Sequence, residues 1–170
     1  AALDPAIQDV NQGETVVYRI TAHLGEGTQS VQISDTLPAG ARFIQIASIN
    51  LGRNITGGAI GAGIPITQVG DALTIDLGTL VTHGDNISDD GDQVTIDVVA
   101  RVRGDTPPGT QLSNAAELTV GSPTHPLVPP VERFASGTVE AVAPDPVAGL
   151  FMGAKLCALE FDGDLERSGF

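Results

Sequence analysis

"QVTIDVVARVRG", the stretch Gln93–Gly104, decides the fold class of this chain. Apolar and mostly polar residues alternate along it, and the apolar set is Val94, Ile96, Val98, Ala100 and Val102. Successive side chains of an extended chain point to opposite faces, so this period of two predicts a strand with one buried face.

The same alternation recurs along most of the chain. Further strands are expected over residues 13–23, 29–35, 41–49, 72–80, 111–120 and 131–142. Their inward positions are Val16, Tyr18, Ile20, Ala22, Val31, Ile33, Leu73, Ile75 and Leu77, whereas the inward face of 41–49 is ambiguous. Turn segments separate the strands, and no amphipathic helix precedes residue 147. About seven to nine short strands predict an all-β, immunoglobulin-like Greek-key β-sandwich with a C-terminal extension.

The chain divides by composition into two parts. Residues 1–146 carry the strand pattern, whereas 147–170 hold the only Lys, the only Met and the only Cys. We therefore predict a sandwich domain over 1–146. The segment 147–170 is expected to be a helix, a linker into another module or an added tail, and the sandwich is expected not to require it.

The charge balance limits the partners. The formal net charge is −13 at 170 residues, and the single cysteine, Cys157, excludes an intrachain disulfide. Such a surface repels nucleic acid and anionic lipid, and no long apolar run is present, so we expect neither nucleic-acid binding nor membrane insertion. The three histidines have no nucleophile at a recognisable spacing, so we expect no enzyme.

"HGDNISDDGDQ", His83–Gln93, is the candidate site. Calcium prefers oxygen ligands, and the expected ligands are Asp85, Asn86, Asp89, Asp90 and Asp92. Ser88 offers a further oxygen, Gly91 permits a sharp turn, and a neighbouring loop could add Asp35 or Asp105. Asp97 lies too far along the strand and is expected on its surface. The alternative is a solvated turn without metal.

Several stretches together resemble a family of surface repeats. "GETVVYRITA", "VQISDTLPAG", "LTIDLGTL", "DQVTIDVVARVRG" and "LSNAAELTV" are similar in order and spacing to bacterial and archaeal conserved-repeat (DUF11) domains, relatives of fimbrial isopeptide-forming modules. The resemblance covers roughly residues 10–120. It implies an immunoglobulin-like building block, and it implies that Asp35 accepts backbone N–H groups of the following turn.

The resemblance also implies a function and a place. It implies a non-catalytic spacer or adhesin module of a larger extracellular or cell-surface protein, and we expect calcium to rigidify it. Its partners would be neighbouring repeats or other surface proteins. Isopeptide-forming modules need a Lys inside the sandwich, and residues 1–146 contain none, so that chemistry is not expected. The alternative is a module that binds a glycan, although exposed aromatic residues for sugar stacking are scarce.

Overall fold

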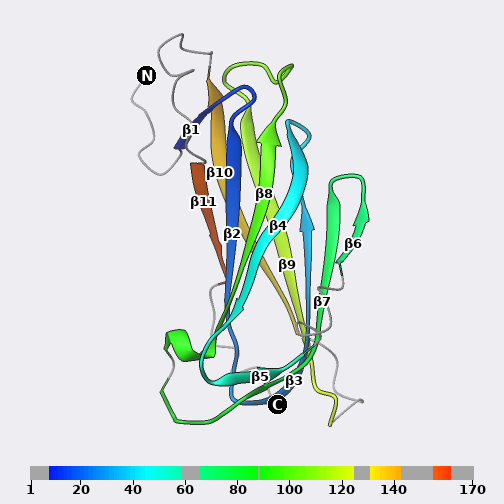
Figure 1. The fold of residues 1–170 in the computed structure, drawn as a ribbon, viewed down its shortest axis with the longest axis vertical. Coiled ribbons are helices and arrows are strands. Elements are labelled where there is room, and N and C mark those ends of the chain that lie inside the picture. Colours follow the sequence, from blue (N-terminus) through cyan, green and yellow to red (C-terminus); the bar gives the residue numbers. More distant parts are fainter. Residues whose placement is uncertain (1–7, 59–65, 88, 125–130, 143–154, 162–170) are drawn as a thin grey trace.

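The computed structural model is a sandwich of two β-sheets (Figure 1). It describes residues 8–58, 66–87, 89–124, 131–142 and 155–161. The larger sheet has the order β1-β10-β9-β3-β7-β5, with β6 also paired to β7. Its strands are β1 Gln8–Asn11, β10 Val131–Val142, β9 Gln111–Gly121, β3 Gly27–Thr36, β7 Ala72–Thr82, β5 Ile55–Gly57 and β6 Ile66–Val69.

The smaller sheet has the order β11-β2-β8-β4. Its strands are β11 Lys155–Glu160, β2 Thr15–His23, β8 Gln93–Val102 and β4 Ala41–Leu51. The fold class expected from the sequence is confirmed. The described strands number eleven, more than expected, because β1, β5, β6 and β11 are short strands of three to six residues.

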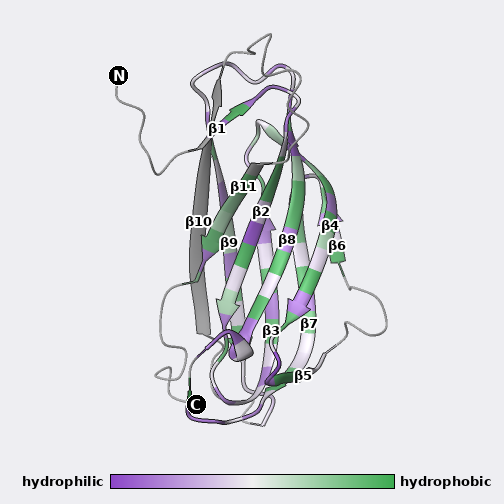
Figure 2. Cartoon of the chain, turned by 60° about the vertical axis from the view of Figure 1, so that its left-hand side comes forward, coloured by the Kyte–Doolittle hydropathy of each residue, from purple (hydrophilic) through white to green (hydrophobic). Residues whose placement is uncertain are grey.

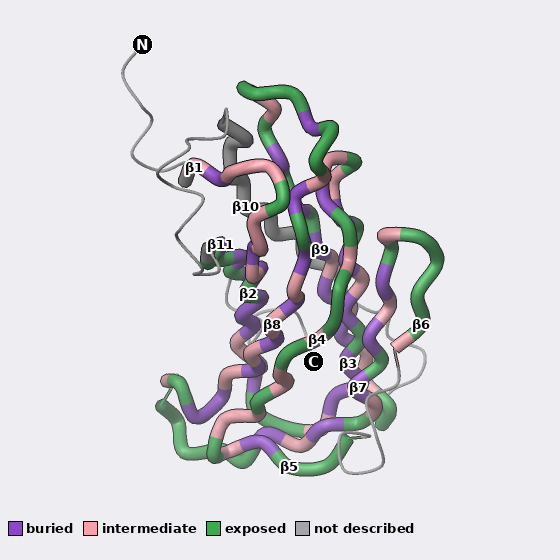
Figure 3. Tube along the Cα trace, turned by 45° about the horizontal axis from the view of Figure 1, so that its top comes forward, coloured by how far each residue is buried: buried purple, intermediate pink, exposed green. Residues whose placement is uncertain are grey.

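The core lies between the two sheets, where the inward faces meet. Every inward position expected in β2, β3, β7 and β8 is buried. Figure 2 shows the alternation of apolar and polar residues along these strands, and Figure 3 shows the matching alternation of burial. The period of two was therefore sufficient to predict the buried side of these four strands.

Strand β4 was ambiguous because it is irregular. Its pairing with β8 shifts register between Phe43 and Gln45 and again between Ile46 and Ser48. Each shift adds a residue, so Phe43, Ile46 and Ile49 all pack against the core at a spacing of three. An extra residue in one strand of a pair is a β-bulge, and two bulges remove the simple alternation.

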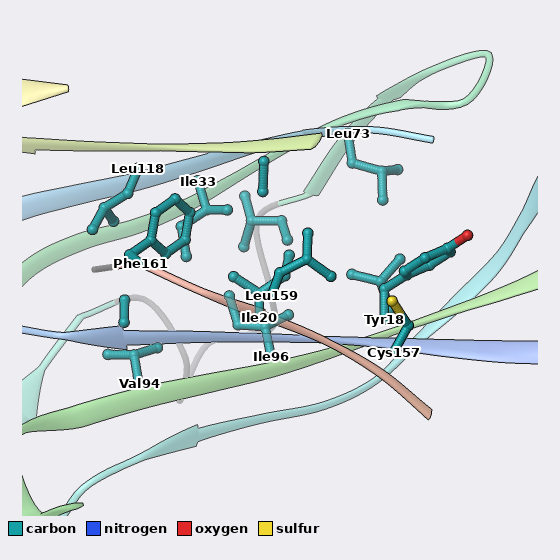
Figure 4. Close-up of a cluster of buried hydrophobic side chains, with 14 of the residues drawn as sticks. Tyr18, Ile20, Ile33, Leu73, Val94, Ile96, Leu118, Cys157, Leu159 and Phe161 are labelled. Carbon is teal, nitrogen blue, oxygen red and sulfur yellow. The ribbon is translucent and has the colours of Figure 1, made fainter. Parts of the chain in front are cut away.

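Part of the C-terminal segment belongs to the sandwich. Residues 155–160 form β11, which pairs in parallel with β2. The expectation of a helix or linker is therefore wrong for these residues. Cys157, Leu159 and Phe161 are buried in the core, and Figure 4 shows Leu159 and Phe161 pointing toward Ile20 and Ile33. Whether residues 1–146 fold without β11 stays a prediction.

Candidate functional site

The acidic loop, residues 83–92, connects β7 to β8, one strand in each sheet. Residues Asp90–Asp92 form a single 3₁₀ turn just before β8. The Asp89 side chain caps this turn, because its Oδ1 accepts the Gly91 backbone N–H at 2.7 Å. Asp is a preferred N-cap residue for this reason. The local sequence therefore uses one of its acids as a backbone cap.

Side chains from the connection between β4 and β5 donate hydrogen bonds into the loop. Asn54 Nδ2 lies 3.0 Å from Asp85 Oδ2 and 3.0 Å from Asp92 Oδ1. Arg53 pairs with the Asp89 carboxylate. Asp92 is only 3% exposed, so its bond with Asn54 satisfies a carboxylate that has little access to water. These donors offset part of the repulsion between the acids.

A third contact comes from the turn between β2 and β3. Glu26 Oε1 accepts the backbone N–H groups of Asp85, at 3.0 Å, and Asn86, at 2.7 Å. Asn86 has φ of 58°, in the left-handed region that Asn tolerates better than most residues. Asp85 Oδ1 in turn accepts the Ile87 N–H at 2.9 Å. Carboxylate–backbone hydrogen bonds therefore hold the turn at residues 85–87 in place.

The pKa of Asp89 is lowered from its ordinary value. The Gly91 N–H is the larger cause, and the hydrogen bond from Arg53 adds to it. Both contacts favour the ionised carboxylate. Asp89 is therefore held as a charged group at neutral pH.

The structure brings the expected calcium ligands into one loop but does not bring in the two candidates from outside it. Asp35 pairs with Leu73 near the start of β7, while the loop leaves the far end of that strand. Asp105 follows β8, whose opposite end begins at the loop. Strand length alone separates both residues from the loop by about 30 Å. The suggestion that Asp35 or Asp105 completes the site is therefore wrong.

Within the described ranges, no three His, Cys, Asp or Glu side chains gather closely enough to form a metal cluster. Ser88, offered as a further ligand, lies outside the described residues. Asp90 is exposed. The calcium site therefore stays a prediction. Asp97, expected on the strand surface, pairs there with Arg19 at 2.9 Å.

A second site, a cluster of three polar side chains, lies inside the core. Tyr18 of β2, Asp35 of β3 and Asn114 of β9 are each 0% exposed. The Tyr18 hydroxyl, both Asp35 carboxylate oxygens and both polar atoms of Asn114 are buried without a hydrogen-bond partner among the described atoms. An unpaired buried polar group costs about 1–3 kcal/mol. Among the described atoms, nothing offsets this cost for the cluster.

Burial dominates the electrostatics of this polar cluster. It raises the pKa of Asp35 from 3.8 to about 7, although the Asn114 side chain, which lies nearby without meeting hydrogen-bond geometry, lowers it in part. Burial also raises the pKa of Tyr18, with the charges of Cys157 and Asp35 as smaller causes. Cys157 lies opposite Tyr18 in the β11–β2 register, and Figure 4 shows the two side chains together. The pKa of the Cys157 thiol is raised by burial as well.

The role expected for Asp35 is not what the structure shows. The turn after β3 was expected to donate backbone N–H groups to this carboxylate, but both of its oxygens lack a partner among the described atoms. Asn114 was missed. The available signal was a polar residue in an inward position: Asp35 follows Val31 and Ile33, and Asn114 falls between Leu112 and Ala116. A polar residue at an inward position of an otherwise regular alternation therefore indicates a buried polar side chain.

Comparisons with known proteins show a similarity of fold and no membership of a family. No family model matches it, so the resemblance to DUF11 repeats stays a prediction. No curated protein matches it either. Among the described residues, none of the helices has the length and apolar character to cross a membrane.

Several solved structures of surface proteins are similar. A C-terminal fragment of the major pilin GBS80 of Streptococcus agalactiae is 11% identical with a TM-score of 0.49, covering 77% of this chain and 55% of that one. Domains D2 and D3 of the major pilin SpaD of Corynebacterium diphtheriae are 16% identical with a TM-score of 0.46, covering 78% and 48%. The collagen-binding domain of a Staphylococcus aureus adhesin is 11% identical with a TM-score of 0.38, covering 73% and 96%.

This chain spans about half the length of each of the two pilin fragments. Likenesses this remote say nothing about what the chain binds. Its function has to be argued from its own residues.

Proposed function

We propose that the chain is a non-catalytic structural module, a spacer or adhesin unit, of a larger bacterial cell-surface or secreted protein. One observation carries the proposal: among the described residues, the groups with the largest rises in pKa, Asp35 and Tyr18, are buried in the core. Perturbed pKa values often mark active sites, but a substrate cannot reach a carboxyl group that is 0% exposed. These groups act on stability instead.

The acidic loop fits the same function. Its carboxylates are used by Arg53, Asn54 and backbone N–H groups, which ties the β4–β5 connection to the start of β8. We include calcium in the proposal as an additional tie at this loop. Support comes from the exposed Asp90 and from the number of carboxylates in one short segment. A bound cation would reduce the repulsion that remains among them.

A glycan-binding module is the second candidate. Stacking on a sugar ring needs an exposed aromatic face. Tyr18 and Phe161 are buried, and the exposed large hydrophobic side chains among the described residues are Ile44, Val69, Ile87 and Leu156. All four are aliphatic, which favours the structural module.

Protease treatment of intact source cells tests the location, and a glycan array tests the alternative. We expect peptides of the chain to be released from intact cells, and we expect the purified chain to give no array signal above background. Release only after lysis would contradict the surface location. Specific, concentration-dependent binding to one glycan class would favour the second candidate.

A further inference from the structure

Strand β2 lies between two neighbours that run in opposite directions. It pairs antiparallel with β8 on one side and parallel with β11 on the other. The parallel ladder has six residue pairs, from Lys155 opposite Val16 to Glu160 opposite Thr21. The Phe161 N–H extends it by donating to the Thr21 carbonyl at 3.1 Å. In Figure 1, β11 and β2 lie side by side over this length.

The direction of β11 determines how tension would act on the ladder. Force from the N-terminal side reaches β2 at Thr15, and force from the C-terminal side reaches β11 at Phe161. Phe161 lies beside Thr21, so the two loading points are about 20 Å apart along the strands, at about 3.3 Å per residue. Opposed forces at these points slide the strands along each other. The hydrogen bonds of the ladder are then loaded together.

The antiparallel side of β2 behaves differently. The residues just before β2 lie beside the end of β8, because the Val102 N–H donates to the Glu14 carbonyl at 2.9 Å and the Gly13 N–H donates to the Val102 carbonyl at 2.9 Å. Forces applied at these adjacent ends would pull across the strands. The bonds would then break one after another, each carrying the load alone.

We propose that the β2–β11 pair is a mechanical clamp that resists tension applied along the chain. Its side chains support this role, because Cys157, Leu159 and Phe161 anchor β11 in the core and must leave it when the strands slide. The four-residue strand β1, which pairs with β10, precedes the clamp and is loaded first. The inference rests on strand direction and register, and it holds whether or not the chain sits on a cell surface.

Single-molecule force spectroscopy on the full chain tests the clamp. We use one variant, Gly104→Cys with Cys157→Val, so that the thiol introduced at position 104 is the only one in the molecule and the apolar anchor at position 157 is kept. Gly104 follows β8, and a Cβ there meets no atom within 4 Å. The same molecule is pulled either between its two chain ends or between its N-terminal end and position 104. The N-terminal handle and the loss of Cys157 are common to both, so the two measurements differ only in the second loading point.

At one loading rate, we expect the end-to-end unfolding force to be at least about twice the force between the N-terminal end and position 104, because forced unfolding follows the barrier to breaking the loaded bonds. A thermal melt confirms that the variant is folded before pulling. Equal forces, or a lower end-to-end force, would overturn the clamp. Neither result bears on the cell-surface location, which the protease experiment tests separately.

Discussion

Asp35 and Asp89 are the same residue type in opposite electrostatic settings. Asp35 is sealed between the sheets, and burial raises its pKa to about 7. Asp89 lies in the β7–β8 loop, where the Gly91 N–H and Arg53 lower its pKa. The difference shows that individual acids of this strongly acidic chain contribute differently to its stability. Donors and water stabilise the charged form in the loop, whereas the core disfavours it.

The largest expected effect is a loss of stability as the pH rises, caused by Asp35. Its folded pKa is raised above its unfolded value, so the folded state holds the proton more tightly. The stabilisation that comes from the protonated group is complete below about pH 4, and it is lost as the pH rises through about 7. Three pKa units correspond to about 4 kcal/mol.

Urea denaturation of wild type and Asp35→Asn between pH 4 and pH 8.5 measures this effect. The Asn variant keeps the shape of the side chain but cannot ionise, so the difference between the two proteins isolates Asp35 from the other acids. We expect wild type to lose stability relative to the variant across this range. A constant difference would mean that Asp35 does not titrate between these values.

The next effect concerns Asn54 in the loop. Asn54→Ala removes the donor of Asp92, which is 3% exposed, and a buried acceptor left without a partner costs about 1–3 kcal/mol. Urea denaturation at pH 7 measures the loss. Arg53→Ala is the matched control, because its ion pair with Asp89 is exposed to solvent, and exposed pairs contribute little. If the two variants were equally destabilised, burial of Asp92 would not be the cause.

Calcium should have a smaller effect on the loop. Extracellular sites bind calcium with a Kd of about 10⁻⁴–10⁻³ M, and a tenfold excess over that value adds about 1.4 kcal/mol to stability. We expect wild type to melt at a higher temperature in millimolar calcium than in chelator. Asp90→Ala should abolish the shift. Identical melts of wild type in both solutions would identify the loop as a metal-free turn.

The smallest expected effect is no change in covalent mass. An amide cross-link to Asn114 or Asp35 needs an amine. Residues 1–146 contain no Lys, and the chain's one Lys, Lys155, is the first residue of β11, paired with Val16 of β2. The expectation from residues 1–146 is that the intact mass of the denatured protein equals the mass calculated from its sequence, and the same measurement tests whether Lys155 supplies the amine. A deficit of one ammonia or one water would show that the polar core cluster has reacted, and it would remove Asp35 from the comparison with Asp89.

Local periodicity predicted much of the fold but little of the candidate site. Val94, Ile96 and Val98 identify the buried face of β8 from sequence alone. The candidate ligands Asp85, Asp89 and Asp90 were grouped only because they are neighbours in the chain. It could not pair Asn54 with Asp92, since that contact joins segments that are distant in sequence.

The sequence by itself determined the buried faces of β2, β3, β7 and β8 and the all-β class, because alternation is a property of the extended chain. Only the tertiary structure decided that Asp35 and Asn114 share the core, that β4 carries two bulges, and that residues 155–160 pair with β2. These features depend on which strands become neighbours across the chain. That choice is made by packing the whole core, and no short stretch of residues records it.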